Sequence, residues 1–166
     1  MISKIRYYLD EACLLKMYHS FVQSHVSYNL LNWSCTHKTF LKPIETKMKK
    51  AIRTISFSKT KYDHTSPLFK RHGILPFFDL VTMKKASFMW QVTHGYAPST
   101  IIHLFQRNQY NQLRFVLPRI RNEHDKVLLV YSSIIAWNSF SDSTKSSSTF
   151  SSFKTKCKRQ LLLNIT

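Results

Sequence analysis

Glycine is almost absent from this chain of 166 residues, which holds only Gly73 and Gly95. Turns that need a positive φ depend largely on glycine, so an architecture built from many β-hairpins is disfavoured. Apolar residues make up 43% of the chain and aromatic residues 14%, which is enough to bury the core of one ordinary domain. We therefore expect a folded, mainly helical protein rather than a flexible polycation.

Apolar residues recur at the three-and-four spacing of a helix in two N-terminal segments. The first segment covers about residues 10–31, and the second covers about residues 40–56 with Thr39 as its cap. The apolar face of the second segment consists of Leu41, Ile44, Met48, Ala51, Ile52 and Ile55. At 100° per residue, Lys42, Lys49, Lys50 and Arg53 fall on the opposite face. This second helix is the best single candidate for a surface that faces phosphates.

A third helix is predicted from Pro76 to about His94, because proline suits the first helical position. Gly95 supplies a left-handed stop, and Pro98 prevents continuation. The segment is apolar on nearly every side, which predicts a central buried helix.

The rest of the chain has weaker patterns. A short helical piece is predicted after Ser99, and extended runs are predicted at residues 114–117 and 126–131. Serine dominates residues 141–150, which we interpret as a linker. A basic C-terminal helix is predicted for residues 151–166, with Lys154 and Lys158 among its cations.

Charge is the strongest global property of the chain. Twenty-five Lys and Arg residues stand against eight Asp and Glu residues, and the resulting net charge of +17 repels itself unless a polyanion or counterions are near. Nucleic acid is the usual partner of such a chain. An anionic membrane surface and a simple excess of surface charge are the alternatives.

Three widely spaced cysteines, Cys13, Cys35 and Cys157, disfavour a disulfide framework and suit a reducing compartment. The first residues are too polar for a secretory signal, and no stretch reaches the length of a membrane span. We therefore expect an intracellular protein, either nuclear or cytoplasmic, that does not bind membranes.

No residue pattern predicts catalysis or a cofactor. A palm-type polymerase holds two metal ions with paired carboxylates, and this chain has no YxDD motif. Glu123, His124 and Asp125 form a polar cluster that solvated loops also show, so we assign no metal site to it. Cys35 and His37, with His19 and His25 before them, lack the paired spacing of a zinc site. No nucleophile elbow is present either.

Aromatic residues between basic ones would allow base stacking together with phosphate contacts. Trp33, Tyr62 and Tyr110 lie in or near predicted loops and are the candidates. Packing in or beside the core is the alternative for each of them.

Six strings follow one another along the chain: MISKIRYYLDEACLLKMYHSFVQSHVSYNLLNWS, LKPIETKMKKAIRTIS, HTSPLFKRHGILPFFDL, FMWQVTHGYAPS, FVLPRIR, and IIAWNSF with SSFKTKCKRQLL. In this order they resemble the region after the catalytic palm in non-LTR retrotransposon reverse transcriptases of the jockey-like and CR-one-like groups. The resemblance covers residues 2–163. Among the matching residues are Tyr18, Tyr28, Trp33, Leu41, Ile44, Lys50, Ala51, Ile52, Arg53, Ile55, Pro67, Leu68, Phe69, Ile74, Leu75, Leu80, Leu117, Pro118, Arg119, Arg121, Trp137, Asn138, Ser139, Ser152, Phe153, Lys154 and Leu161.

Two departures indicate a diverged or decaying copy. Ser34 stands where the family tends to have glycine, and residues 134–136 replace its usual GPK. The resemblance also implies that endonuclease, fingers and palm precede residue 1 in the parent enzyme, so that Met1 corresponds to an internal methionine.

The resemblance implies a helical thumb-like and connecting region over residues 1–140, followed by the linker and the basic helix. We therefore expect a non-catalytic fragment of an RNA-directed DNA polymerase that binds RNA, DNA or an RNA:DNA hybrid without sequence preference, with affinity falling steeply as salt rises. The predicted phosphate-contacting residues are Lys42, Lys49, Lys50, Arg53, Arg119, Arg121, Lys154 and Lys158. The alternative is a structural or protein-interaction remnant whose exposed surface once contacted the missing palm.

Overall fold

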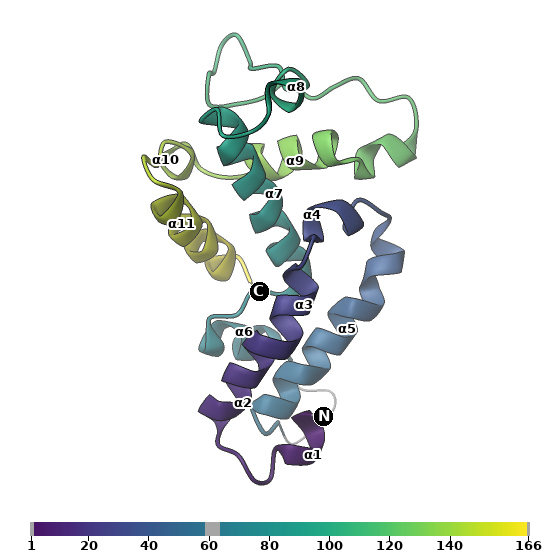
Figure 1. The fold of residues 1–166 in the computed structure, drawn as a ribbon, viewed down its shortest axis with the longest axis vertical. Coiled ribbons are helices and arrows are strands. Elements are labelled where there is room, and N and C mark those ends of the chain that lie inside the picture. Colours follow the sequence, from purple (N-terminus) through teal and green to yellow (C-terminus); the bar gives the residue numbers. More distant parts are fainter. Residues whose placement is uncertain (1, 59–63, 166) are drawn as a thin grey trace.

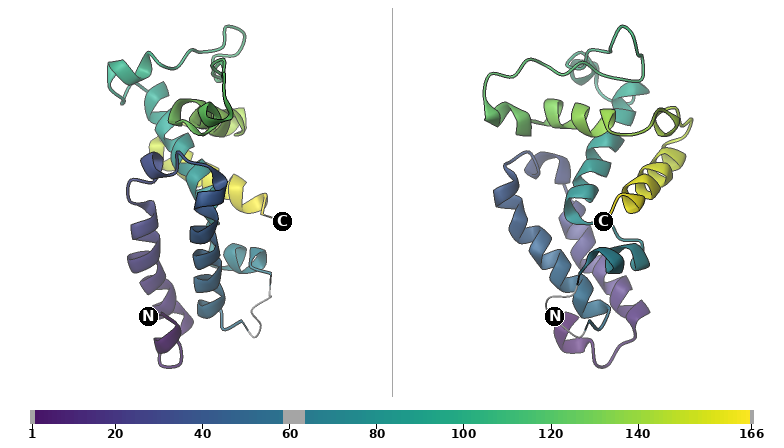
Figure 2. Two further views of the ribbon diagram at one scale, coloured as in Figure 1. Left: turned by 90° about the vertical axis from the view of Figure 1, so that its right-hand side faces the viewer. Right: turned by 180° about the vertical axis from the view of Figure 1, so that it is seen from behind.

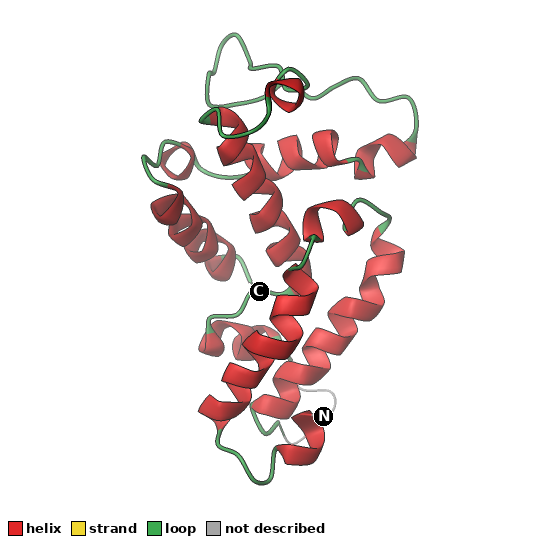
Figure 3. Ribbon diagram, in the orientation of Figure 1, coloured by secondary structure: helices red, strands yellow, loops and turns green. Residues whose placement is uncertain are grey.

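The computed structural model describes residues 2–58 and 64–165 of the chain. Every regular element in this part is a helix, and no strand occurs in it (Figure 3). The elements are α1 (Ile2–Ile5), α2 (Glu11–Met17), the π-helical η1 (Tyr18–Gln23), α3 (Ser24–Ser27), α4 (Leu30–Trp33), α5 (Lys38–Ile55), α6 (Ser66–His72), α7 (Phe77–Thr93), α8 (Ser99–Ile102), the 3-10 helix η2 (Glu123–Val127), α9 (Leu129–Asn138), α10 (Asp142–Lys145) and α11 (Phe150–Leu163). The mainly helical class expected from the sequence is confirmed.

The first helical run consists of α2, η1 and α3, and it lies antiparallel to α5 (Figures 1 and 2). The Asp10 carboxylate begins it by accepting a hydrogen bond of 2.9 Å from the Cys13 backbone N–H. Asn29 ends the run with a left-handed φ of 48°, a conformation that asparagine tolerates better than most residues. The predicted single helix therefore stops before Leu31, and α4 follows as a separate turn.

α5 confirms the predicted apolar face. Leu41, Met48, Ile52 and Ile55 are buried in the core. The predicted cap was wrong, because the helix begins at Lys38, before Thr39.

α7 is the central element of the fold, as predicted. α9 and α11 pack against it from the C-terminal half of the chain, and α4 and α5 pack against it from the N-terminal half (Figure 1). Gly95 follows the helix with a φ of 75°, which confirms the predicted left-handed stop. α8 then begins at Ser99, where a short helical piece was expected.

An aromatic cluster joins α7, α9 and α11. The rings of Trp137 and Phe153 stack with centroids 5.6 Å apart, and Trp90 lies 6.2 Å from Phe153. All three side chains are almost completely buried. Phe115 of the connection between α8 and η2 meets the edge of Trp137 at 6.4 Å.

Two residues of α9 fasten that long connection to the core. The Trp137 indole Nε1–H donates to the Leu113 carbonyl at 2.8 Å. The Asn138 amide oxygen accepts from the Phe115 N–H at 3.2 Å, and its amide nitrogen donates to the Phe115 carbonyl at 3.0 Å. The side chain of Asn138 thus pairs with both backbone groups of one residue, as a neighbouring strand would.

The two predicted extended runs differ from the structure. Residues 126–131 lie in η2 and α9, so the strand prediction there was wrong. The apolar run continues through Ile134 to Trp137, and periodicity alone does not separate a buried helix from a buried strand. Residues 114–117 make only one isolated bridge, between Phe115 and Arg107.

The serine-rich segment is also more ordered than a linker. It contains α10, and Thr144, Lys145 and Ser147 are buried. The buried Lys145 ammonium lies 3.2 Å from the Asp142 carboxylate. Composition suggested a flexible connection because serine and threonine are common in loops, whereas here their hydroxyls bond within the segment and to Gln160 of α11.

Candidate nucleic-acid interface

The exposed side of α5 carries two of the predicted phosphate contacts. Lys42 and Lys50 are exposed, on the side of the helix opposite the buried Met48 and Ile52. Both lysines reach solvent because the apolar face holds the helix against the core.

Lys49 and Arg53 lie differently, at the edge of α5. The Lys49 ammonium is 2.7 Å from the Glu45 carboxylate, one turn earlier. Both basic residues line a pocket together with Glu45 and Asp79. Burial raises the pKa of Asp79, and the nearby charge of Glu45 raises it further. These two cations therefore face local carboxylates, which a phosphate would have to replace.

The third predicted group lies in the connection between α8 and η2, at the end of the molecule away from the N-terminal helices (Figures 1 and 2). Arg119 and Arg121 are both exposed there. The Arg121 backbone N–H donates to the Asp125 carboxylate at 3.1 Å, which holds the end of the connection against η2.

α11 presents the fourth group. Lys154 is exposed and its ammonium lies 4.7 Å from the centroid of the Phe150 ring, within the range of a cation–π contact. Lys158 lies one turn later. The predicted residues therefore come from three separate parts of the fold: α5, the α8–η2 connection and α11.

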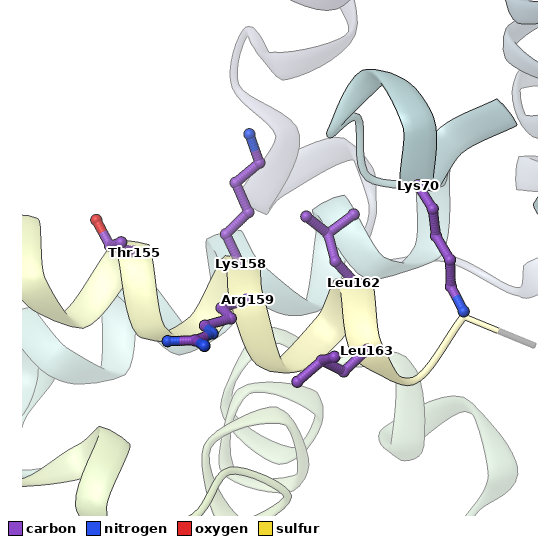
Figure 4. Close-up of a pocket in the computed structure, with 6 residues that line it drawn as sticks. All are labelled: Lys70, Thr155, Lys158, Arg159, Leu162 and Leu163. Carbon is purple, nitrogen blue, oxygen red and sulfur yellow. The ribbon is translucent and has the colours of Figure 1, made fainter. Parts of the chain in front are cut away.

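Lys158 belongs to a groove between α6 and α11 with a volume of about 670 Å³. We call it the α6–α11 groove; Figure 4 shows the six residues that line it, which are Lys70, Thr155, Lys158, Arg159, Leu162 and Leu163. No carboxylate is among them. The three cations make no hydrogen bond or ion pair with other described residues.

Two groove cations were missed by the sequence prediction. Lys70 comes from α6 and Arg159 follows Lys158 on α11. The basic run at residues 70–72 and the run at residues 154–159 were visible in the sequence. That they meet was not visible, because Lys70 and Lys158 are 88 positions apart in the chain and the residues between them follow unrelated patterns.

The residues weighed as metal ligands have other partners. No group of three His, Cys, Asp or Glu residues in the described ranges is arranged to hold a metal ion. Asp125 joins Asn122 in a capping box at the start of η2, and Glu123 pairs with Lys126. The His37 and His124 rings meet at 3.0 Å between Nε2 and Nδ1.

The three residues predicted as candidates for base stacking differ in their exposure to solvent. Trp33 stacks on Phe77 with centroids 5.8 Å apart, and its Nε1–H donates to the Tyr28 carbonyl, so it packs against the core. Tyr110 is 98% exposed in the α8–η2 connection. Tyr62 lies outside the described residues.

Among the described helices, none has the length and apolar character that crossing a membrane requires. Comparison of the chain with protein-family models, curated proteins and solved structures finds no match. The class that the fold defines is therefore a mainly helical, strongly basic protein.

Proposed function

We propose that this chain is a non-catalytic fragment of a non-LTR retrotransposon reverse transcriptase, and that it binds RNA, DNA or an RNA:DNA hybrid through phosphates without reading sequence. The α6–α11 groove is the observation that carries the binding proposal. It brings Lys70, Lys158 and Arg159 together without a carboxylate among its lining residues.

Cations in this arrangement favour a phosphate backbone. Arg159 offers a planar fork of donors, and the two lysines add point charges. Leu162 and Leu163 give the groove an apolar side that a sugar or a base can contact. Groups of this kind recognise the backbone and not the base edges, so binding is expected to tolerate any sequence.

Binding is measured by fluorescence anisotropy of the purified chain with a labelled RNA:DNA hybrid and with a scrambled duplex, from low to moderate salt. We expect similar affinities for both, with a steep loss as salt rises. Each phosphate contact contributes roughly 0.7–0.9 to the slope of log K against log salt. The triple variant K70Q/K158Q/R159Q should therefore flatten the slope by about 2 to 3 units.

The variant K4Q/K16Q/K84Q serves as the control, because it also removes three positive charges, but from α1, α2 and α7. Its slope should change by less than about 1 unit, since it removes long-range attraction but no groove contact. A second comparison, K42Q/K49Q/K50Q/R53Q, measures the contribution of α5. Equal slopes for the groove variant and the control would refute the groove as the binding surface.

Exposed aromatic residues support a second candidate function, a protein-interaction remnant. In the N-terminal part of the chain, five aromatic residues are more than half exposed: Tyr7, Tyr8, Phe21, Tyr28 and Phe40. Such side chains are typical of surfaces that contact another protein domain, which in the proposed parent enzyme would be the palm. Sedimentation of the purified chain separates the two functions: concentration-dependent association without nucleic-acid binding would favour the interaction remnant.

A further inference from the structure

A second cavity lies between the α4–α5 corner, α7 and the η2–α9 segment. Its volume is about 310 Å³, at the lower end of the range for small-molecule sites. We call it the α7–α9 cavity. Its polar lining consists of Ser34, Thr36, Lys38, Thr82, Lys85, Lys126, Ser132 and Ser139, and no Asp or Glu is among the lining residues.

Lys85 is the central feature of the α7–α9 cavity. Only 7% of this residue is exposed, and its ammonium donates to the Ser132 hydroxyl at 2.8 Å. No carboxylate of the described residues pairs with it. Buried lysines usually pair with a carboxylate, as Lys145 does: it is also buried, and its ammonium pairs with Asp142.

A buried ammonium without an anion is costly because its charge has left water. Desolvation lowers the pKa of Lys85 for this reason. An anion in the cavity would supply the missing opposite charge.

Ser34 provides a second, independent sign of a ligand. It is 3% exposed, it lines the cavity, and its hydroxyl has no hydrogen-bond partner. Buried hydroxyls in folded proteins are nearly always paired, so an unpaired hydroxyl on a residue that lines a cavity is a candidate partner for a ligand. Lys38 adds a second cation at the same cavity, and Lys126 also lines it, with its ammonium paired to the Glu123 carboxylate.

We propose that the α7–α9 cavity binds the phosphate group of a phosphate monoester, with the Lys85 ammonium and the Ser34 hydroxyl as its buried donors. A phosphate monoester carries close to two negative charges and three acceptor oxygens, which match several cations and hydroxyls better than a carboxylate would. A divalent cation is excluded as the occupant, because the lining has lysines and no carboxylate. The volume accommodates a phosphate with a small organic group attached.

The test is isothermal titration of the full chain with inorganic phosphate and with a nucleoside 5′-monophosphate. Lys85→Met keeps the length of the side chain and removes its charge, and it should weaken binding by about tenfold or more. Lys84→Met removes the neighbouring charge on α7, which does not line the cavity, and should leave the dissociation constant within about twofold.

Ser34→Ala gives a milder second variant that removes only the unpaired hydroxyl. It should weaken binding by about threefold to tenfold while leaving the circular dichroism spectrum unchanged. If Lys85→Met fails to fold, this variant alone decides the matter. Unchanged binding in the Ser34 variant would then overturn the proposal, as would the absence of any binding to the wild-type chain at millimolar phosphate.

Two oligonucleotides distinguish a free monoester from the phosphorylated end of a strand. If the ligand is a strand end, a 5′-phosphorylated oligonucleotide should bind more tightly than its 5′-hydroxyl counterpart, and Lys85→Met should abolish the difference. If the ligand is free, the two oligonucleotides bind equally while the mononucleotide still depends on Lys85. Loss of groove binding in K70Q/K158Q/R159Q leaves both outcomes unaffected, so the two proposals fail separately.

Discussion

Replacing Asn138 by alanine removes two hydrogen bonds that hold the α8–η2 connection against α9. Both join the side chain to the backbone of Phe115, at 3.2 Å and 3.0 Å, and Phe115 is 4% exposed. Losing one partner of a buried backbone group costs about 1 to 3 kcal/mol. Because Asn138 is only half-buried, water replaces part of what is lost, and we expect the variant to lose about 2 to 3 kcal/mol of unfolding free energy.

Asn138→Asp keeps the size and the acceptor of the side chain but places a carboxylate oxygen against the Phe115 carbonyl. At neutral pH it should destabilise at least as much as alanine does. On acidification the introduced carboxyl group gains a proton and becomes a donor, so its deficit should shrink as the pH falls through its raised pKa. The alanine deficit should not follow this pH dependence.

Urea denaturation at several pH values, followed by tryptophan fluorescence and circular dichroism, gives both free energies. Wild-type protein at each pH is the reference. An alanine variant within about 0.5 kcal/mol of wild type would refute the anchoring role of Asn138, since that cost is typical of a surface substitution. If the Asn138→Asp variant is destabilised equally at all pH values, the amide nitrogen of Asn138 does not face the Phe115 carbonyl.

Three further predictions concern other parts of the fold. Burial raises the pKa of the Cys157 thiol to about 12, so in the native protein at pH 8 a thiol reagent should modify the exposed Cys13 and leave Cys157 unmodified by mass spectrometry. Gly95→Ala should cost about 1 kcal/mol in thermal denaturation, because the φ of 75° is strained for alanine while the space around it is open. The hydrogen bond from Cys13 lowers the pKa of Asp10 from its ordinary value, so the ionised Asp10 stabilises α2 at higher pH. The stability difference between wild type and Asp10→Ala should vanish as the pH falls through that lowered pKa.

Local patterns were sufficient to predict the long helices. The apolar spacing of α5 placed Leu41, Met48 and Ile52 on one face, and the continuous apolar character of α7 marked it as central. Both properties depend on the 3.6-residue period, which is set within one or two turns of the chain. Gly95 ended α7 where expected, because a positive φ is a property of a single residue.

The same local patterns did not predict the structure of two segments whose conformation depends on contacts with other helices. Residues 126–131 form η2 and the start of α9, a helix that packs against α7 through later residues such as Ile134 and Trp137. The serine-rich segment is ordered because Gln160 of α11 accepts from its hydroxyls. Nothing within either segment encodes these partners.

The sequence by itself determined that this protein is helical, strongly basic and built around α7, since composition and short-range periodicity carry that information. Only the tertiary structure decided which charges act together. It joined Lys70 of α6 to Lys158 and Arg159 of α11, and it enclosed Lys85 with Ser34. Charge is counted along the chain, but a binding site depends on distances between side chains, and those distances are set by how the helices pack.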